Sequence, residues 1–182
     1  LSILNGTLQL MAPVQPRGAN LPIDTFFRSL AQDQGPNAAC IILSGTGTDG
    51  TLGVKAIKGE VGMVMVQDEE SAKYDGMPRS AISTRLVDYV LPPEKMPKQL
   101  IKYMMHASRS ASPRIVPVQG QIPIALQKIF VILRARTNHD FSLYKKNTIC
   151  RRIERRMNVH QIDDINDYVR YIQESDREAE IL

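Results

Sequence analysis

The sequence has no long apolar run and no recognisable leader at its first residues. Its best apolar runs, at 40–43 and 63–66, have the length of a strand, whereas a membrane-spanning helix needs about 20 apolar residues. The start, Leu1-Ser2-Ile3, has neither an initiator methionine nor the charged beginning of a signal peptide. We therefore expect a piece of a longer soluble, cytoplasmic protein.

Cysteine is also scarce, because the 182 residues contain only Cys40 and Cys150. Their separation lacks the spacing of a metal site, so no metal is expected. They fit buried thiols in a reducing compartment better than a disulfide scaffold, with one bridge between them as the alternative. A hydrophobic content of 43% with 23% charged residues excludes wholesale disorder and a collagen-like repeat.

The net charge of +4 is concentrated in the second part of the chain. Residues 1–110 contain 11 basic and 10 acidic side chains, whereas residues 111–182 contain 12 and 9. Between Arg134 and Arg156 there are eight cations and only two acids. A basic patch of this kind selects an anionic partner but does not specify which one.

The first 107 residues show the rhythm of an α/β domain with a parallel sheet. A hairpin signal at Asn5-Gly6 comes first. Strand patterns then alternate with helical patterns that begin near residues 21, 51, 78 and 93. The three strand patterns lie at 38–43, 63–66 and 86–91.

The remaining residues predict a linker and a small all-α domain. Residues 108–122 are rich in serine and proline and have no periodicity, so we expect an interdomain linker there. Residues 123–182 show helical spacing at 123–136, 145–157 and 163–173 and no strand signal. The expected fold is thus a parallel-sheet α/β portion followed by helices.

A glycine-rich loop at 44–50 follows the first strand and has the pattern G-x-G-x-x-G, with Asp68 at the end of the next strand. This is the dinucleotide-binding pattern. However, Asp49 would add negative charge where the turn should bind an anion. Nucleotide binding through this loop is one alternative. A second alternative is that Asp49 only caps the helix that begins at Thr51.

Three motifs occur in order along the first domain: Ser-Gly-Thr-Gly-Thr-Asp-Gly at 44–50, Gln-Asp-Glu-Glu-Ser at 67–71 and Gly-Met-Pro-Arg-Ser-Ala at 76–81. Together they resemble the C-terminal half of chemotaxis protein-glutamate methylesterases of the CheB type, over about residues 1–103. The resemblance implies that Asp49 is the acid of a Ser-His-Asp triad. Such a carboxylate fixes the imidazole tautomer and stabilises the imidazolium.

The same resemblance places the triad Ser and His upstream of these motifs, yet the sequence has no histidine before His106. His139 and His160 follow without a family motif around them. The sequence also departs from the family at Thr46, where methionine is usual, and at Ser80, where glutamate is common. We therefore expect these 182 residues alone to be inactive in ester hydrolysis.

A second resemblance covers about residues 124–182. Tyr-Lys at 144–145 and Arg-Arg-Ile-Glu-Arg-Arg-Met at 151–157 resemble the N-terminal helical domain of chemoreceptor methyltransferases of the CheR type. In that family a further domain binds S-adenosylmethionine, so no cofactor is expected within these residues. The two resemblances imply a hybrid signalling enzyme that removes and adds methyl esters on receptor glutamates.

At 100° per residue the cations of this helix fall within an arc of about 140°, opposite Ile149, Ile153 and Met157. The cations are Lys145, Arg151, Arg152, Arg155 and Arg156. The resemblance implies that this face binds the acidic methyl-accepting helices of a chemoreceptor. A solvated basic face and a nucleic-acid surface are the alternatives, and the absence of interleaved aromatic residues weakens the second.

Overall fold

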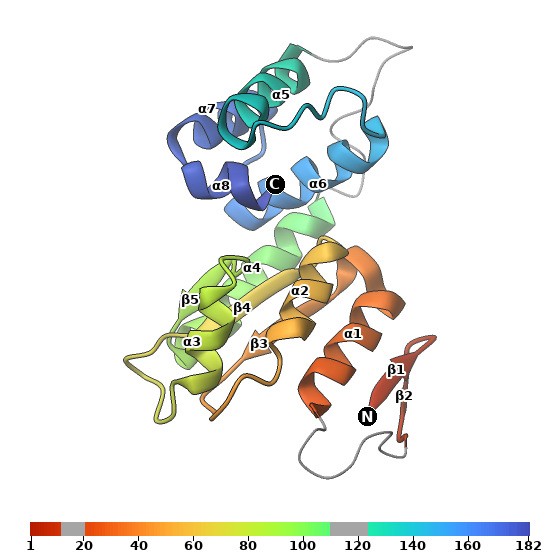
Figure 1. The fold of residues 1–182 in the computed structure, drawn as a ribbon, viewed down its shortest axis with the longest axis vertical. Coiled ribbons are helices and arrows are strands. Elements are labelled where there is room, and N and C mark those ends of the chain that lie inside the picture. The colour runs from red at the N-terminus through yellow and green to blue at the C-terminus, as the bar shows by residue number, and fades with distance from the viewer. Residues whose placement is uncertain (12–20, 110–123) are drawn as a thin grey trace. The chain divides into compact units, whose positions relative to one another are not determined.

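The computed structural model describes residues 1–11, 21–109 and 124–182. They form two compact units, residues 1–99 and 100–182 (Figure 1). The division falls inside a helix and before the boundary expected at 107. Tyr103 therefore belongs to the second unit, where it is buried and its ring lies under the Arg155 guanidinium. Beyond its first two residues, the linker predicted at 108–122 lies outside the described residues.

A three-stranded parallel sheet forms the centre of the first unit. Its order is β3 (Ala39–Ile42), β4 (Met63–Gln67) and β5 (Tyr89–Leu91). Every residue of the central strand β4 is buried, as its continuous apolar run predicts. The sheet confirms the α/β class, although β5 is shorter than the run predicted at 86–91.

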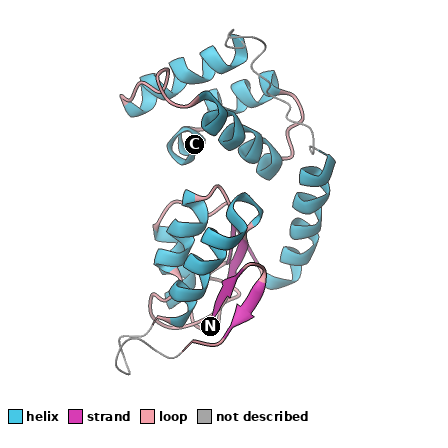
Figure 2. Cartoon of the chain, turned by 90° about the vertical axis from the view of Figure 1, so that its right-hand side faces the viewer, coloured by secondary structure: helices cyan, strands magenta, loops and turns pink. Residues whose placement is uncertain are grey.

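Three helices of the first unit accompany the sheet, and a fourth helix follows it and continues into the second unit (Figure 2). Helix α1 begins at a proline that suits the first turn and ends before Gly35, whose φ of 51° closes it. Helix α3 begins two residues before the expected start at Pro78. The helices are α1 (Pro22–Gln34), α2 (Thr51–Gly59), α3 (Gly76–Ser83) and α4 (Met96–Arg109).

The predicted hairpin is present at the start of the chain. Strands β1 (Ser2–Leu4) and β2 (Thr7–Gln9) pair antiparallel across Asn5 and Gly6, whose φ values are 49° and 72°. The hairpin is attached to α1, because the Ile3 N–H donates a hydrogen bond of 2.9 Å to Ser29 Oγ. Ser29 is thus a structural residue of the hairpin contact.

The second unit is helical. Its main core side chains include Ile149, Ile153 and Met157, which pack with residues of the helices before and after them, as the helical wheel predicts. A short last helix was not predicted. The helices are α5 (Ile124–Thr137), α6 (Lys146–His160), α7 (Ile165–Glu174) and α8 (Asp176–Ile181). Within the described ranges, no helix has the length and apolar character needed to cross a bilayer.

Candidate functional site

The three motifs of the first unit meet at the carboxyl ends of β3 and β4. The Ser44 N–H donates to Gln67 Oε1 at 2.8 Å, and the Tyr74 N–H donates to Ser44 Oγ at 2.9 Å. Gly45 accepts from the Met77 N–H at 2.8 Å through its carbonyl oxygen. Backbone and side-chain hydrogen bonds therefore join the motifs into one edge, and Ser44 has a structural role in it.

Two glycines of this edge have close neighbours, which are backbone at Gly76 and a methionine side chain at Gly45. A Cβ on Gly76 would lie 3.0 Å from the Gly47 nitrogen, and one on Gly45 would lie 2.4 Å from Met77 Sδ. Gly47 itself has a φ of 82°, in the region that favours glycine. The glycine-rich turn thus brings the loop after β3 against the start of α3.

Asp49 lies, as predicted, at the carboxyl edge of the sheet, in the turn that leads into α2. Its half-buried carboxylate accepts two backbone hydrogen bonds from the first turn of α1. The Ile23 N–H donates to Oδ2 at 3.1 Å, and the Asp24 N–H donates to Oδ1 at 2.9 Å. Leu21, the N-cap residue of α1, makes no side-chain cap, so Asp49 supplies the cap from a distant part of the chain.

The alternative in which Asp49 caps the helix from Thr51 is wrong. The N-cap of α2 is Gly50, and no side chain caps that position. The first turn of α2 is instead bound by Asp24, whose Oδ1 accepts from the Gly53 N–H at 2.6 Å. Asp24 is buried, with 3% of its surface exposed.

The same contact bears on the dinucleotide alternative. In that alternative the N-terminus of α2 would bind a pyrophosphate, but it already holds the carboxylate of Asp24. Asp68, the acid that would bind a ribose hydroxyl, accepts a 2.8 Å hydrogen bond from the Ser71 N–H through Oδ1. Both observations oppose nucleotide binding at this loop.

All three histidines of the sequence lie beyond residue 99, so the first unit contains none. His106 Nδ1 lies 3.0 Å from Asn158 Oδ1. His160 Nε2 lies 2.8 Å from Glu178 Oε2. Neither of these two contacts involves a serine, the partner that a base of a nucleophile–base pair requires.

The five cations assigned to one face of α6 separate into different environments. Lys145 and Arg151 are exposed, and Arg152 is half-buried. The Arg155 guanidinium lies over the Tyr103 ring, 4.8 Å from its centroid. Arg156 is buried, with 3% of its surface exposed, so its assignment to an open basic face is wrong.

Arg156 binds Glu178, which is 2% exposed, through two hydrogen bonds. Nε donates to Oε1 at 2.8 Å, and a terminal nitrogen donates to Oε2 at 2.6 Å. Tyr168 also donates to Oε1, at 2.6 Å. Burial raises the pKa of Glu178, but hydrogen bonds from Arg156 and His160 outweigh it and lower this pKa to about 2.

The sequence did contain a signal for the burial of Arg156. This residue comes three positions after Ile153 and seven after Ile149, which is the spacing of one helix face. It therefore lies at the end of the cationic arc, beside the apolar stripe. Glu178, its partner from α8, has no comparable signal.

The two cysteines are buried and free, as expected of thiols without a bridge. Burial, followed by the charge of Asp88, raises the pKa of Cys40 to about 12. Burial also raises the pKa of Cys150. In the described part of the chain, no group of three or more His, Cys, Asp or Glu residues is placed to bind a metal ion.

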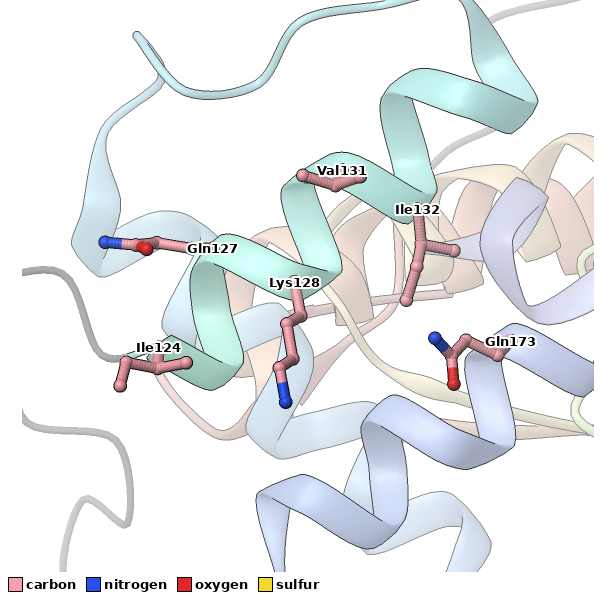
Figure 3. A pocket seen from close by; sticks show the side chains of 6 residues that line it. All are labelled: Ile124, Gln127, Lys128, Val131, Ile132 and Gln173. Carbon is pink, nitrogen blue, oxygen red and sulfur yellow. The ribbon is translucent and has the colours of Figure 1, made fainter.

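A shallow groove of about 310 Å³ lies on the second unit between α5 and α7 (Figure 3). Lys128 is the ionisable residue in its lining, which contains neither an acid nor a histidine. The groove therefore lacks the residues for acid–base chemistry. Its lining is Ile124, Gln127, Lys128, Val131, Ile132 and Gln173.

Two family models match the chain. The CheB methylesterase model matches residues 4–100, and the model of the CheR methyltransferase all-alpha domain matches residues 124–182. The first match contains the interlocked motifs and Asp49. The second contains helices α5 to α8.

Individual proteins are similar to this chain over different shares of its length. An uncharacterised 104.1 kDa protein of Rhodobacter capsulatus is 37% identical over 186 residues, covering 91% of this chain and 20% of that protein. A protein-glutamate methylesterase/protein-glutamine glutaminase of Moorella thermoacetica is 39% identical over 79 residues, covering 43% of this chain and 19% of that protein. The chain thus spans about a fifth of the length of these curated relatives.

A solved structure is similar to this chain over part of its length. The Thermotoga maritima CheB methylesterase catalytic domain is 37% identical, with a TM-score of 0.42, over 43% of this chain and 41% of that chain. The family matches take in both described units. The chain therefore belongs to the CheB methylesterase family, and it continues into an all-alpha domain of the CheR methyltransferase type.

Proposed function

We propose that the first unit is the part of a protein-glutamate methylesterase that supplies the triad acid, Asp49. The observation that carries this proposal is the position of its carboxylate. It lies at the carboxyl edge of a parallel sheet, where sites of open α/β folds form. The Ile23 and Asp24 N–H groups orient both of its oxygens. Each carboxylate oxygen has a second lone pair, which can accept an imidazole N–H.

In the proposed reaction, the serine and histidine come from outside these 182 residues. The histidine takes the serine proton, and the serine oxygen attacks the carbonyl of a glutamate methyl ester. The proton then passes to the leaving methoxide, so methanol departs and an acyl-enzyme remains. Water hydrolyses this intermediate to glutamate by the same proton transfers. Asp49 stabilises the imidazolium in both steps.

The 182-residue chain by itself is expected to release no methanol from methylated receptor above the uncatalysed rate, because its first unit has no histidine to take a serine proton. We also expect it not to bind S-adenosylmethionine, whose binding domain the resemblance places further along. Methanol release measures the ester hydrolysis, and calorimetric titration measures the binding of S-adenosylmethionine. Hydrolysis that depends on Asp49, or micromolar affinity for the donor, would contradict this expectation.

For the second unit, we propose a docking role toward the acidic methyl-accepting helices of a chemoreceptor. The proposal rests on a basic surface, defined as Lys145, Arg151 and Arg152, which are exposed or half-buried. Arg155 lies against Tyr103 and Arg156 binds Glu178, so both are left out of this surface. Three cations on one segment attract a helix rich in glutamate through charge complementarity.

Reversing Arg151 and Arg152 to glutamate is expected to abolish binding of a glutamate-rich receptor peptide. Stability should change little, because exposed charges contribute roughly 0 to 1 kcal/mol each. Fluorescence anisotropy at rising salt measures the binding, which should weaken as the Debye length falls from about 10 Å at 0.1 M. The matched control is Arg170→Glu, which reverses an exposed cation on α7.

Two results would remove support for receptor docking. One is that Arg170→Glu weakens peptide binding as much as the double variant does. The other is that duplex DNA binds as tightly as the receptor peptide at physiological salt. The basic surface would then be a general polyanion site, as the nucleic-acid alternative requires.

A further inference from the structure

Helices α1 and α2 exchange their N-terminal caps. Asp49, which lies two residues before the start of α2 at Thr51, binds the N–H groups of Ile23 and Asp24 in the first turn of α1. Asp24, which belongs to that first turn, binds the Gly53 N–H in the first turn of α2 at 2.6 Å. The acid next to α2 thus binds free N–H groups of α1, and the acid in α1 binds a free N–H group of α2.

The packing around this exchange is tight. A Cβ on Gly53 would lie 2.5 Å from Phe27 Cβ, so only glycine lets the two helices approach at this point. A Cβ on Gly50 would lie 3.1 Å from Ile23 Cγ2, and the φ of Gly50 is 95°. Gly50 and Gly53, which follow Asp49 at the start of α2, are thus held in close contact with α1.

Stability alone does not explain the buried carboxylate of Asp24. Its Oδ1 has the Gly53 N–H as a partner, whereas its buried Oδ2 has no hydrogen-bond partner within the part of the chain that the structure describes. Removing a carboxylate from water for one hydrogen bond is costly. Its position suits a different role, which is to fix the start of α2 and the turn that carries Asp49.

We propose that Asp24 is a positioning residue for Asp49, an inference that rests on the methylesterase function proposed above. Asp24 acts in two ways. Its side chain holds the first turn of α2 at Gly53, and its backbone N–H orients Asp49 Oδ1. Without the side-chain contact, α2 and α1 separate at their N-termini, and the Asp49 carboxylate moves relative to the histidine it must orient.

The test uses the full-length methylesterase that contains this chain, with a methylated receptor as substrate. Asp24→Ala is expected to lower kcat about 10- to 100-fold with KM within about twofold, because small misplacements of a reacting group cost rates of this size. Asp24→Asn keeps an oxygen that can accept from the Gly53 N–H, so it should recover most of the lost kcat. Gly53→Ala forces the helices apart and should reproduce the effect of Asp24→Ala.

The matched control is Asp88→Asn. Asp88 is also a buried carboxylate that accepts a backbone N–H, from Val64 at 2.9 Å, but it precedes β5 at the opposite edge of the sheet. This variant should lower the melting temperature and leave kcat unchanged. Asp49→Asn, measured in parallel, tests the proposed function itself, which fails if that variant retains full activity.

Two outcomes overturn the positioning role while Asp49→Asn remains inactive. One is a folded Asp24→Ala enzyme with unchanged kcat. The other is an Asp24→Asn enzyme as impaired as Asp24→Ala, which would mean that charge rather than hydrogen-bond geometry matters. If Asp24→Ala does not fold, the other two variants decide. An unchanged kcat of Gly53→Ala overturns the role, and so does a complete loss of kcat in Asp24→Asn.

Discussion

Asp49→Asn in the full-length methylesterase is expected to lower kcat about 10⁴-fold, as the loss of the triad acid does in serine proteases. The asparagine cannot stabilise an imidazolium by charge, and its amide can hold the imidazole in the wrong tautomer. The rate of methanol release from a methylated receptor measures the effect. KM should change little, because Asp49 is assigned to the histidine and not to the substrate.

The fold should survive this change. Asparagine keeps a carbonyl oxygen for one of the Ile23 and Asp24 N–H groups, so the weakened cap costs about 0.5–2 kcal/mol. The matched control is Asp68→Asn, an acid at the end of β4 whose Oδ1 accepts the Ser71 N–H. If the Asp68 variant loses as much activity as the Asp49 variant, Asp49 has no special role at this edge.

Arg156→Ala is expected to destabilise the second unit by about 3–5 kcal/mol, because it leaves the buried carboxylate of Glu178 without its cation. Urea unfolding followed by circular dichroism measures the change. Arg151→Ala removes an exposed cation from the same helix, and it should change the unfolding free energy by less than about 1 kcal/mol. Equal effects of the two substitutions would show that the ion pair contributes nothing beyond a surface charge.

The same pair makes stability depend on pH. The pKa of Glu178 is lowered from 4.5 to about 2 in the folded chain. A carboxylate with a lowered folded-state pKa stabilises fully above its unfolded-state value. The contribution is therefore present above about pH 4.5 and is lost as pH falls toward 2. Glu178→Gln should flatten the pH dependence of the unfolding free energy across that interval.

Much of the fold could be predicted from local signals. The pair Asn5-Gly6 specifies its hairpin, and the unbroken apolar run of β4 specifies a strand buried on both faces. Helix α8 was missed because six residues with four charges give no periodicity. Helix α3 begins at Gly76, two residues before Pro78, because proline favours the first turn of a helix without fixing its first residue.

The site was predictable only in part. The order of strand, glycine turn and helix fixes the edge on which Asp49 lies, whichever helix its side chain contacts. Its partners are set by packing between α1 and α2, which is not encoded in any short stretch. A weaker signal existed for Asp24, which comes three residues before Phe27 and seven before Ala31 and so shares the inward face of α1.

The exchanged caps also have a consequence for how the first unit folds. Because α1 is capped by Asp49 and α2 by Asp24, neither helix has a side-chain cap at its first turn until the other has docked. The two helices therefore form one cooperative unit. Their first-turn amides, such as those of Asp24 and Gly53, lie 29 residues apart in the sequence. They should nevertheless become accessible to solvent hydrogen exchange together, through a single opening event.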